Sequence, residues 1–73
     1  MGDYMKYLES KPGVASGHPV IKGTRLRIAH SLKMRLDGVS VEEMHEWYPW
    51  VSSAQFRGAI NEAVQQFDHP AHV

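Results

Sequence analysis

The sequence has no cysteine, and no apolar run in it approaches the roughly 20 residues that span a bilayer. The missing cysteine excludes a disulfide framework and a thiolate metal site, and it fits a reducing cytoplasm. The first residues, Met1 to Tyr4, also lack the charged and apolar regions of a signal peptide. These absences together predict a soluble cytoplasmic protein with no membrane partner.

Patterns that carry catalysis are missing as well. We find no glycine-rich phosphate loop, no paired carboxylates and no Ser-His-Asp set that could be placed on one surface. The sequence therefore predicts a protein that is not an enzyme and that holds no cofactor and no metal ion.

A net charge is also absent, because eight basic residues balance eight acidic ones. The charges are nevertheless segregated along the chain. Seven basic and two acidic residues lie up to Leu36, and one basic and six acidic residues lie from Asp37 onward, so the halves carry +5 and −5. Since an acidic surface repels phosphates, any nucleic-acid contact must come mainly from the first half. Alternatively, the two halves neutralise each other within the chain or across a dimer.

The apolar content of the sequence is enough for one small folded domain. The chain has 73 residues, of which 42% are apolar, and it shows no internal repeat. A chain of this size buries a marginal core, and pairing with a second copy would stabilise it. We therefore expect a single domain, residues 1–73, that forms a homodimer.

Two short motifs mark the starts of neighbouring helices. Ser40 is followed three residues later by Glu43, and Ser52 is followed three residues later by Gln55. Each pair is a capping box, in which the serine oxygen accepts a free amide at the helix start and the Glu or Gln side chain binds the amide of the serine. Because Pro49 lies between the boxes, the first of these helices can be only about two turns long. A short helix, a sharp corner and a longer helix are the outline of a helix-turn-helix.

The segment before these motifs predicts a β-hairpin over residues 18–28, after a poorly patterned lead-in over residues 1–17. Two runs of β-favouring residues flank Gly23, which supplies the positive φ of a tight turn. In the second run, apolar residues alternate with Arg25 and Arg27. The hairpin should therefore have one apolar side and one basic side.

Helical periodicity predicts a three-helix core within residues 28–67. The helices are expected over residues 28–36, 41–47 and 53–67, with Pro70 stopping the third and residues 68–73 forming a tail. The expected core positions are Ile28, Leu32, Leu36, Met44, one or both of Trp47 and Tyr48, Phe56, Ala59, Ile60, Ala63, Val64 and Phe67. The predicted fold class is mainly α with a small β-hairpin, a three-helix helix-turn-helix-like (winged-helix-like) domain.

The other side of the third helix presents small and polar residues around Gly58 and Asn61. A glycine inside a helix costs about 1 kcal/mol relative to alanine, so its presence indicates that a DNA groove or a partner helix approaches the backbone closely. Two-point hydrogen bonds would let Arg57 read guanine and let Asn61 or Gln55 read adenine, while the serines at the helix start hold a phosphate. The predicted DNA-binding residues are Lys22, Arg25, Arg27, Ser52, Ser53, Gln55, Arg57 and Asn61.

Two features leave other interpretations open. The turn of a helix-turn-helix often contains glycine, whereas the corner here, residues 48–51, is bulky, so the angle between the helices can differ. Arg57 can also pair with Asn61 or Glu62 along its own helix instead of contacting DNA.

Three blocks of sequence carry a family resemblance: Gly17-His18-Pro19-Val20-Ile21-Lys22-Gly23-Thr24-Arg25, Gly38-Val39-Ser40-Val41-Glu42-Glu43 and Tyr48-Pro49. With these blocks the chain resembles a widespread prokaryotic family, catalogued as domain of unknown function four hundred thirty-three and regarded as VapB-like antitoxins. The resemblance covers about Tyr7 to Phe67. It implies a dimeric winged or helix-turn-helix-like DNA-binding domain that is encoded beside a PIN-like ribonuclease toxin.

The leading functional prediction is therefore a DNA-binding transcriptional autoregulator, the antitoxin component of a toxin-antitoxin pair, whose partner is double-stranded operator DNA. The alternative is a protein-interaction module that binds and masks an acidic partner, such as a PIN-like ribonuclease, without itself binding DNA.

Overall fold

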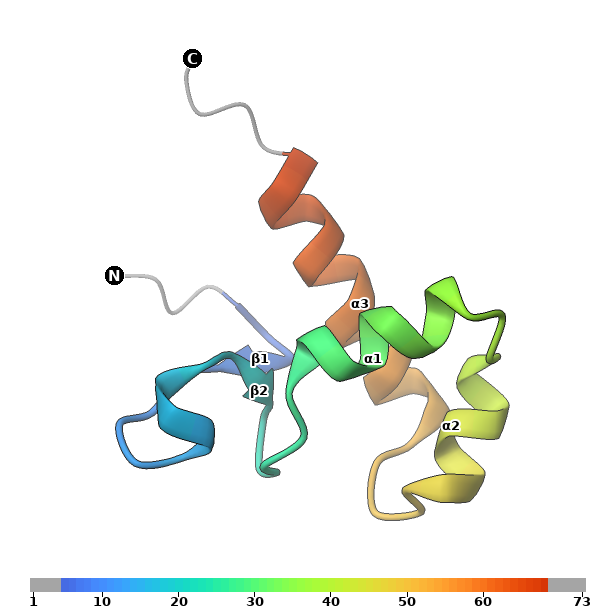
Figure 1. The fold of residues 1–73 in the computed structure, drawn as a ribbon, viewed down its shortest axis with the longest axis horizontal. Helices are drawn as coiled ribbons and strands as arrows, with labels where there is room; N and C mark the ends of the chain where they lie inside the picture. The colour runs from blue at the N-terminus through green and yellow to red at the C-terminus, as the bar shows by residue number, and fades with distance from the viewer. Residues whose placement is uncertain (1–4, 69–73) are drawn as a thin grey trace.

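The computed structural model describes residues 5–68, which form three helices and a small antiparallel sheet (Figure 1). In chain order the elements are β1 (Leu8–Glu9), the 3-10 helix η1 (Ala15–Gly17), β2 (Val20–Ile21), α1 (Ile28–Leu36), α2 (Val41–Trp47) and α3 (Ser53–Asp68). This confirms the predicted fold class, and the predicted helix bounds agree closely with the observed ones. Pro70 and the rest of the predicted tail after Asp68 lie outside the described residues.

Both predicted capping boxes are present and fix the starts of α2 and α3. The Ser40 hydroxyl accepts the amide of Glu43 at 3.1 Å, and Glu43 Oε1 accepts the amide of Ser40 at 3.1 Å. The Ser52 hydroxyl accepts the amide of Gln55 at 3.0 Å, and Gln55 Oε1 accepts the amide of Ser52 at 2.9 Å. Each box satisfies amides that have no partner inside the helix, which is why both helices begin at these positions.

The bulky corner between α2 and α3 is held by packing and by two hydrogen bonds. The amide of Val51 donates to the Tyr48 carbonyl at 2.9 Å, and Nδ1 of His45 donates to the Val51 carbonyl at 2.7 Å. The Val51 side chain is fully buried, and the ring of Tyr48 packs against the rings of Trp50 and Phe56. The corner therefore needs no glycine, because its large side chains anchor it to the core.

The core lies where α1, α2 and β2 meet the first half of α3. Its buried apolar residues are Leu8, Val20, Ile21, Ile28, Met34, Met44, Val51, Phe56, Ala59 and Ala63. Of the positions predicted for the core, Tyr48, Leu32 and Ile60 are partly buried against this cluster. The side chain of Phe67 is outside the described part of the structure.

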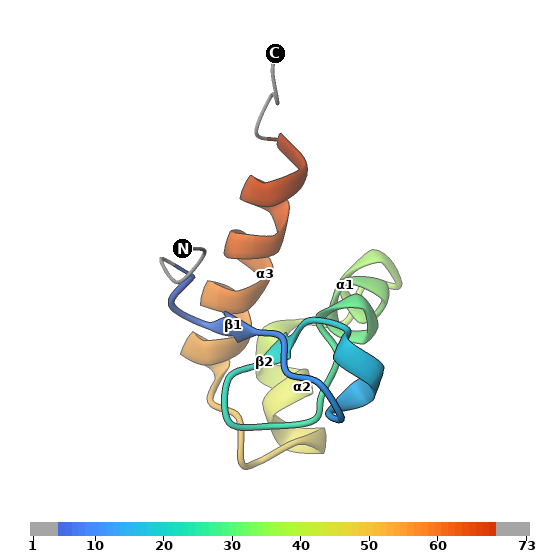
Figure 2. The same cartoon turned by 90° about the vertical axis from the view of Figure 1, so that its left-hand side faces the viewer.

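Two predicted core positions are wrong, because Leu36 is 84% exposed and Val64 is 50% exposed. Leu36 is the last residue of α1, and the last turns of α3 extend beyond the other helices (Figures 1 and 2). Helical periodicity gives the apolar face of a helix but not the length over which a neighbour covers it. Despite this exposed apolar surface, no helix in the described residues is long and apolar enough to cross a membrane.

The small sheet differs from the predicted hairpin in its strand pairing. β2 pairs with β1, which lies in the predicted lead-in, with Leu8 opposite Ile21. The second predicted strand makes only one bridge, between Val20 and Arg27. The reason is local, since the Thr24 hydroxyl donates to the Ile21 carbonyl and accepts the amide of Leu26, and these bonds form a turn in place of a ladder.

Ser31 is the one buried side chain among residues 5–66 whose hydroxyl has no hydrogen-bond partner. A buried hydroxyl without a partner loses its bonds to water and gains nothing in return. We therefore expect Ser31→Ala to raise the free energy of unfolding by about 1 kcal/mol. Urea denaturation followed by tryptophan fluorescence measures this change, and a loss of stability would show that the hydroxyl has a partner in solution.

Candidate nucleic-acid interface

The loop between β2 and α1, residues 22–27, carries the three cations predicted to contact DNA. Lys22, Arg25 and Arg27 are all exposed, whereas Ile28 at the end of the loop is buried. In both Figure 1 and Figure 2 this loop lies at the same end of the molecule as the start of α3. We call residues 22–27 the basic loop.

Several bonds fix the shape of the basic loop. Gly23 has a φ of 80°, and its amide donates to a carboxylate oxygen of Glu9 at 2.9 Å. The amide of Ile21 donates to the Leu26 carbonyl at 3.0 Å, which closes the loop at its base. Because an L side chain rarely adopts a φ of this size, Gly23 is required for the turn. The loop therefore presents Arg25 on a backbone whose shape these bonds define.

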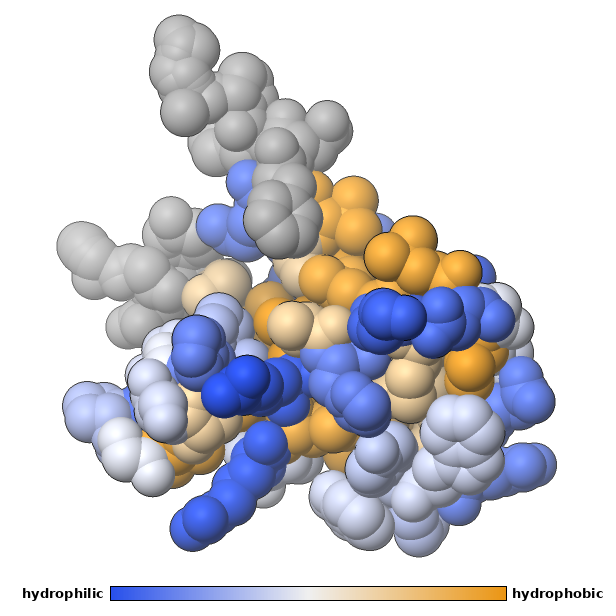
Figure 3. Space-filling view, in the orientation of Figure 1, coloured by the Kyte–Doolittle hydropathy of each residue, from blue (hydrophilic) through white to orange (hydrophobic). Residues whose placement is uncertain are grey.

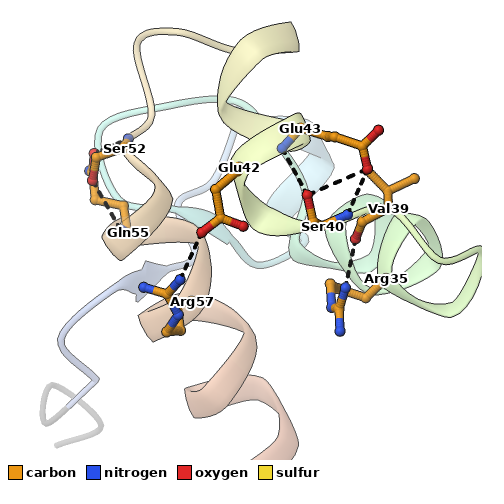
Figure 4. A network of polar contacts seen from close by, with 8 residues as sticks. All are labelled: Arg35, Val39, Ser40, Glu42, Glu43, Ser52, Gln55 and Arg57. Atoms are coloured by element: carbon orange, nitrogen blue, oxygen red, sulfur yellow. Dashed lines mark hydrogen bonds and ion pairs between the residues drawn. The ribbon is translucent and has the colours of Figure 1, made fainter.

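At the start of α3, the capping box already uses some of the hydrogen-bonding groups of the residues predicted to bind DNA (Figure 4). The hydroxyl oxygen of Ser52 and Oε1 of Gln55 each accept an amide there, while Ser53 is half-buried as the first residue of the helix. Gln55 retains its side-chain amide nitrogen as a donor, but its oxygen is committed. A two-point contact from Gln55 to adenine would require breaking the box.

Arg57 and Asn61 lie one turn apart on α3 and form a ridge between two surface grooves. Both residues line a groove of about 570 Å³ on the side of α2 and a groove of about 350 Å³ on the side of Tyr7. The Arg57 guanidinium donates to Glu42 of α2 at 3.2 Å (Figure 4). The alternative that Arg57 pairs along its own helix is therefore wrong in its partner: the carboxylate comes from the first turn of α2, and the Glu62 oxygens accept the amides of Lys6 and Tyr7.

The close approach at Gly58 comes from the chain itself. The ring of Tyr7 packs on Gly58 so tightly that a Cβ atom there would overlap it. The two carboxylate oxygens of Glu62 accept the amides of Lys6 and Tyr7, at 2.6 and 2.9 Å. We call residues 5–8 the N-terminal strap. The strap, and not a DNA groove or a partner helix, explains why α3 has a glycine at this position.

The segregated charges of the chain do not cancel across its two halves. The ion pairs among residues 5–66 are Lys11 with Glu9, Lys33 with Asp37 and Arg57 with Glu42. Only the pair of Lys33 and Asp37 joins the two halves, and it is a local pair within one helical turn. Within the same residues, Arg25 and Arg27 make no ion pair, so the basic loop keeps its positive charge.

The structure thus groups the predicted residues into three sets. These are the basic loop, the capping box at the start of α3, and the ridge of Arg57 and Asn61. No hydrogen bond or ion pair among residues 5–66 joins the loop to the other two sets. Sequence reasoning missed the N-terminal strap and the Glu62 carboxylate that holds it, although the glycine at position 58 was a signal of a close neighbour.

The model of the family described as Protein of unknown function (DUF433) matches residues 8–63 of the chain. This match includes the basic loop, both capping boxes, the corner and most of α3. Neither a curated protein nor a solved structure matches the chain. Since the family model covers well over half of the sequence, the chain belongs to the DUF433 family.

Proposed function

We propose that this protein is a DNA-binding transcriptional autoregulator and that it serves as the antitoxin of a toxin-antitoxin pair. The observation that carries the proposal is that the basic loop lies at the same end of the molecule as the start of α3. The two arginines of this loop have no ion pair among residues 5–66. In a helix-turn-helix, the first residues of the second helix contact bases while nearby basic groups contact phosphates.

The chemistry of each set supports a separate role in this proposal. Arg25 and Arg27 supply charge to flanking phosphates. Arg57 is the candidate for reading guanine, and its pair with Glu42 does not prevent this, because Arg57 is 61% exposed and such exposed pairs contribute at most about 1 kcal/mol. Asn61 is the candidate for reading adenine, since Gln55 could do so by two hydrogen bonds only if the capping box opened.

Salt dependence and sequence preference test these roles separately. Arg25→Gln is expected to reduce the slope of log K against log salt by about 0.9, because one phosphate contact is lost, with sequence preference unchanged. Arg57→Ala is expected to relax preference at one base pair by about 1 to 3 kcal/mol. The measurement is fluorescence anisotropy on a duplex of the protein's own promoter, between 50 and 200 mM salt.

Lys33→Gln is the control for the change of charge, since Lys33 lies on α1 and pairs with Asp37. If Arg25→Gln and Lys33→Gln lower the slope equally, the basic loop has no special role. Absence of any duplex binding by the unchanged protein at 50 mM salt would contradict DNA binding itself.

A second candidate function, the masking of a protein partner without DNA binding, is favoured by the two tryptophans at the corner. Trp47 is 55% exposed and Trp50 is 64% exposed. Exposed tryptophans are enriched among the residues that contribute most to protein interfaces. A PIN-like ribonuclease encoded by the neighbouring gene is the partner to test, by measuring whether the protein binds it and inhibits its RNA cleavage in the absence of DNA.

We also propose that the protein acts as a homodimer through α1 and α3. Leu32 and Leu36 lie one turn apart on α1, and Ile60 and Val64 lie one turn apart on α3. Figure 3 shows hydrophobic side chains gathered in a continuous band over these two helices. We call these four residues the apolar band. The four residues of the band carry no charge, so the bands of two copies can pack together by two-fold symmetry without bringing like charges into contact. An acidic partner would instead be recognised by the basic loop.

A further inference from the structure

The N-terminal strap is an integral part of the fold. Besides the bonds to Glu62, the carbonyl of Tyr7 accepts the amide of Lys22 at 2.9 Å, and Leu8 is buried and paired with Ile21 in the sheet. These contacts join the strap to α3 on one side and to the start of the basic loop on the other. Figure 2 shows the chain entering β1 across the face of α3.

The strap limits how α3 can meet a DNA groove. An α-helix with its side chains is about 10–12 Å wide, and the major groove is about 12 Å wide. A helix therefore fills the groove by itself, and a helix with a strap on its outer face does not fit. Gly58, where Tyr7 packs, lies about 7.5 Å along the axis from the first residue of α3. Only the residues before Gly58, among them Arg57, can enter, so the strap excludes Asn61, which lies almost one turn beyond Gly58, from reading bases.

The same strap carries a cation beside the Tyr7 ring on α3. The ammonium group of Lys6 lies 5.8 Å from the centre of the Tyr7 ring, which itself rests on α3. Lys6 is exposed, and within residues 5–66 its ammonium group makes no ion pair. The Glu62 carboxylate binds the backbone amides of Lys6 and Tyr7, and the ion pairs among residues 5–66 do not include one between it and the ammonium.

We infer that the N-terminal strap is part of the DNA interface: it limits α3 to entering the major groove by its first turns, and it holds Lys6 at the groove edge as a phosphate contact. This inference rests on the proposed function. It extends the interface to an element that the predicted site residues leave out. The strap then has two effects, one steric and one electrostatic, and both depend on the packing of Tyr7 on Gly58.

The electrostatic effect is tested with Lys6→Gln and, as a control, Lys11→Gln, which removes a charge from another exposed position of the lead-in, where it is paired with Glu9. Binding of each variant to the promoter duplex is measured between 50 and 200 mM salt. We expect Lys6→Gln to reduce the salt slope by about 0.9, so that its affinity relative to the unchanged protein shifts by about 3.5-fold over this range. Lys11→Gln should leave the slope unchanged.

The positioning effect is tested with Gly58→Ala, which changes no charge and displaces the Tyr7 ring. In this background the effect of Lys6→Gln on the slope should fall to less than half, because the ammonium is no longer held in place. Thermal melting of each variant checks that the domain is folded, and Tyr7→Leu, which removes the ring without adding an atom at Gly58, is the second variant if the alanine variant is unfolded.

The outcomes separate the inference from the proposed function. Binding by the unchanged protein with equal slopes for Lys6→Gln and Lys11→Gln would overturn the inference and leave DNA binding in place. An effect of Lys6→Gln that persists in the Gly58→Ala background would overturn the positioning role of the strap. No duplex binding by any form would remove the proposed function, and the inference with it.

Discussion

Replacing Phe56 by alanine is expected to lower the free energy of unfolding by about 3 to 5 kcal/mol. Phe56 is the largest fully buried side chain among residues 5–66, and it lies in the first turn of α3 against the ring of Tyr48. Its removal leaves a cavity where α2, the corner and α3 meet. A domain of 73 residues has a free energy of unfolding of about 4 to 11 kcal/mol, so this one change would remove a large fraction of its stability.

Urea denaturation measures the change, with the tryptophans of the corner as probes. Gln65→Ala is the control on the same helix, because Gln65 is exposed and lies outside the apolar band, and it should change the free energy of unfolding by less than about 0.5 kcal/mol. Under the proposed function, Phe56→Ala should also weaken DNA binding in proportion to the unfolded fraction. A cost below about 1.5 kcal/mol would mean that the corner repacks freely and does not fix the direction of α3.

The helices could be predicted closely because their signals are local. A capping box needs only residues three apart, so Ser40 with Glu43 and Ser52 with Gln55 define two helix starts without knowledge of the rest of the fold. The end of α1 is similarly marked by Gly38, which has a φ of 90°. These signals depend on bonds within one turn, and tertiary packing does not override them.

The strand pairing and the strap could not be predicted in the same way. β1 has two residues, and its pairing with β2 depends on contacts between positions far apart in the sequence. The packing of Tyr7 on Gly58 joins residues 51 positions apart, and the sequence shows only the glycine. The glycine predicts that another group approaches the helix closely at this position. It does not tell whether that group belongs to a DNA groove, a partner helix or the chain itself.

For the candidate site, residue type and exposure could be predicted, but polar partners could not. The alternation in the second β-favouring run correctly placed Arg25 and Arg27 on the exposed side. The commitment of Gln55 to the capping box follows from the same motif that predicted the helix, and this competes with its predicted role in base reading. The pairing of Arg57 with Glu42 depends on the angle between α2 and α3, which the bulky corner sets.

Leu36→Glu is expected to weaken self-association by more than about 100-fold, or about 3 kcal/mol. The expectation rests on the proposed dimer, in which the apolar band of one copy covers that of the other. A two-fold interface would bury the new carboxylate twice, without a partner. Because Leu36 is 84% exposed in the single chain, the same change should alter its unfolding free energy by no more than about 0.5 kcal/mol.

Sedimentation equilibrium over a range of protein concentrations measures the association. Ser10→Glu is the control, because it adds the same charge at an exposed position of the lead-in, away from the apolar band. A dimer of Leu36→Glu as tight as that of the unchanged protein would place the interface elsewhere, and an unchanged protein that remains monomeric would exclude the dimer. If association is lost as expected, binding to a two-fold symmetric operator should weaken as well, since each half-site would then bind a monomer on its own.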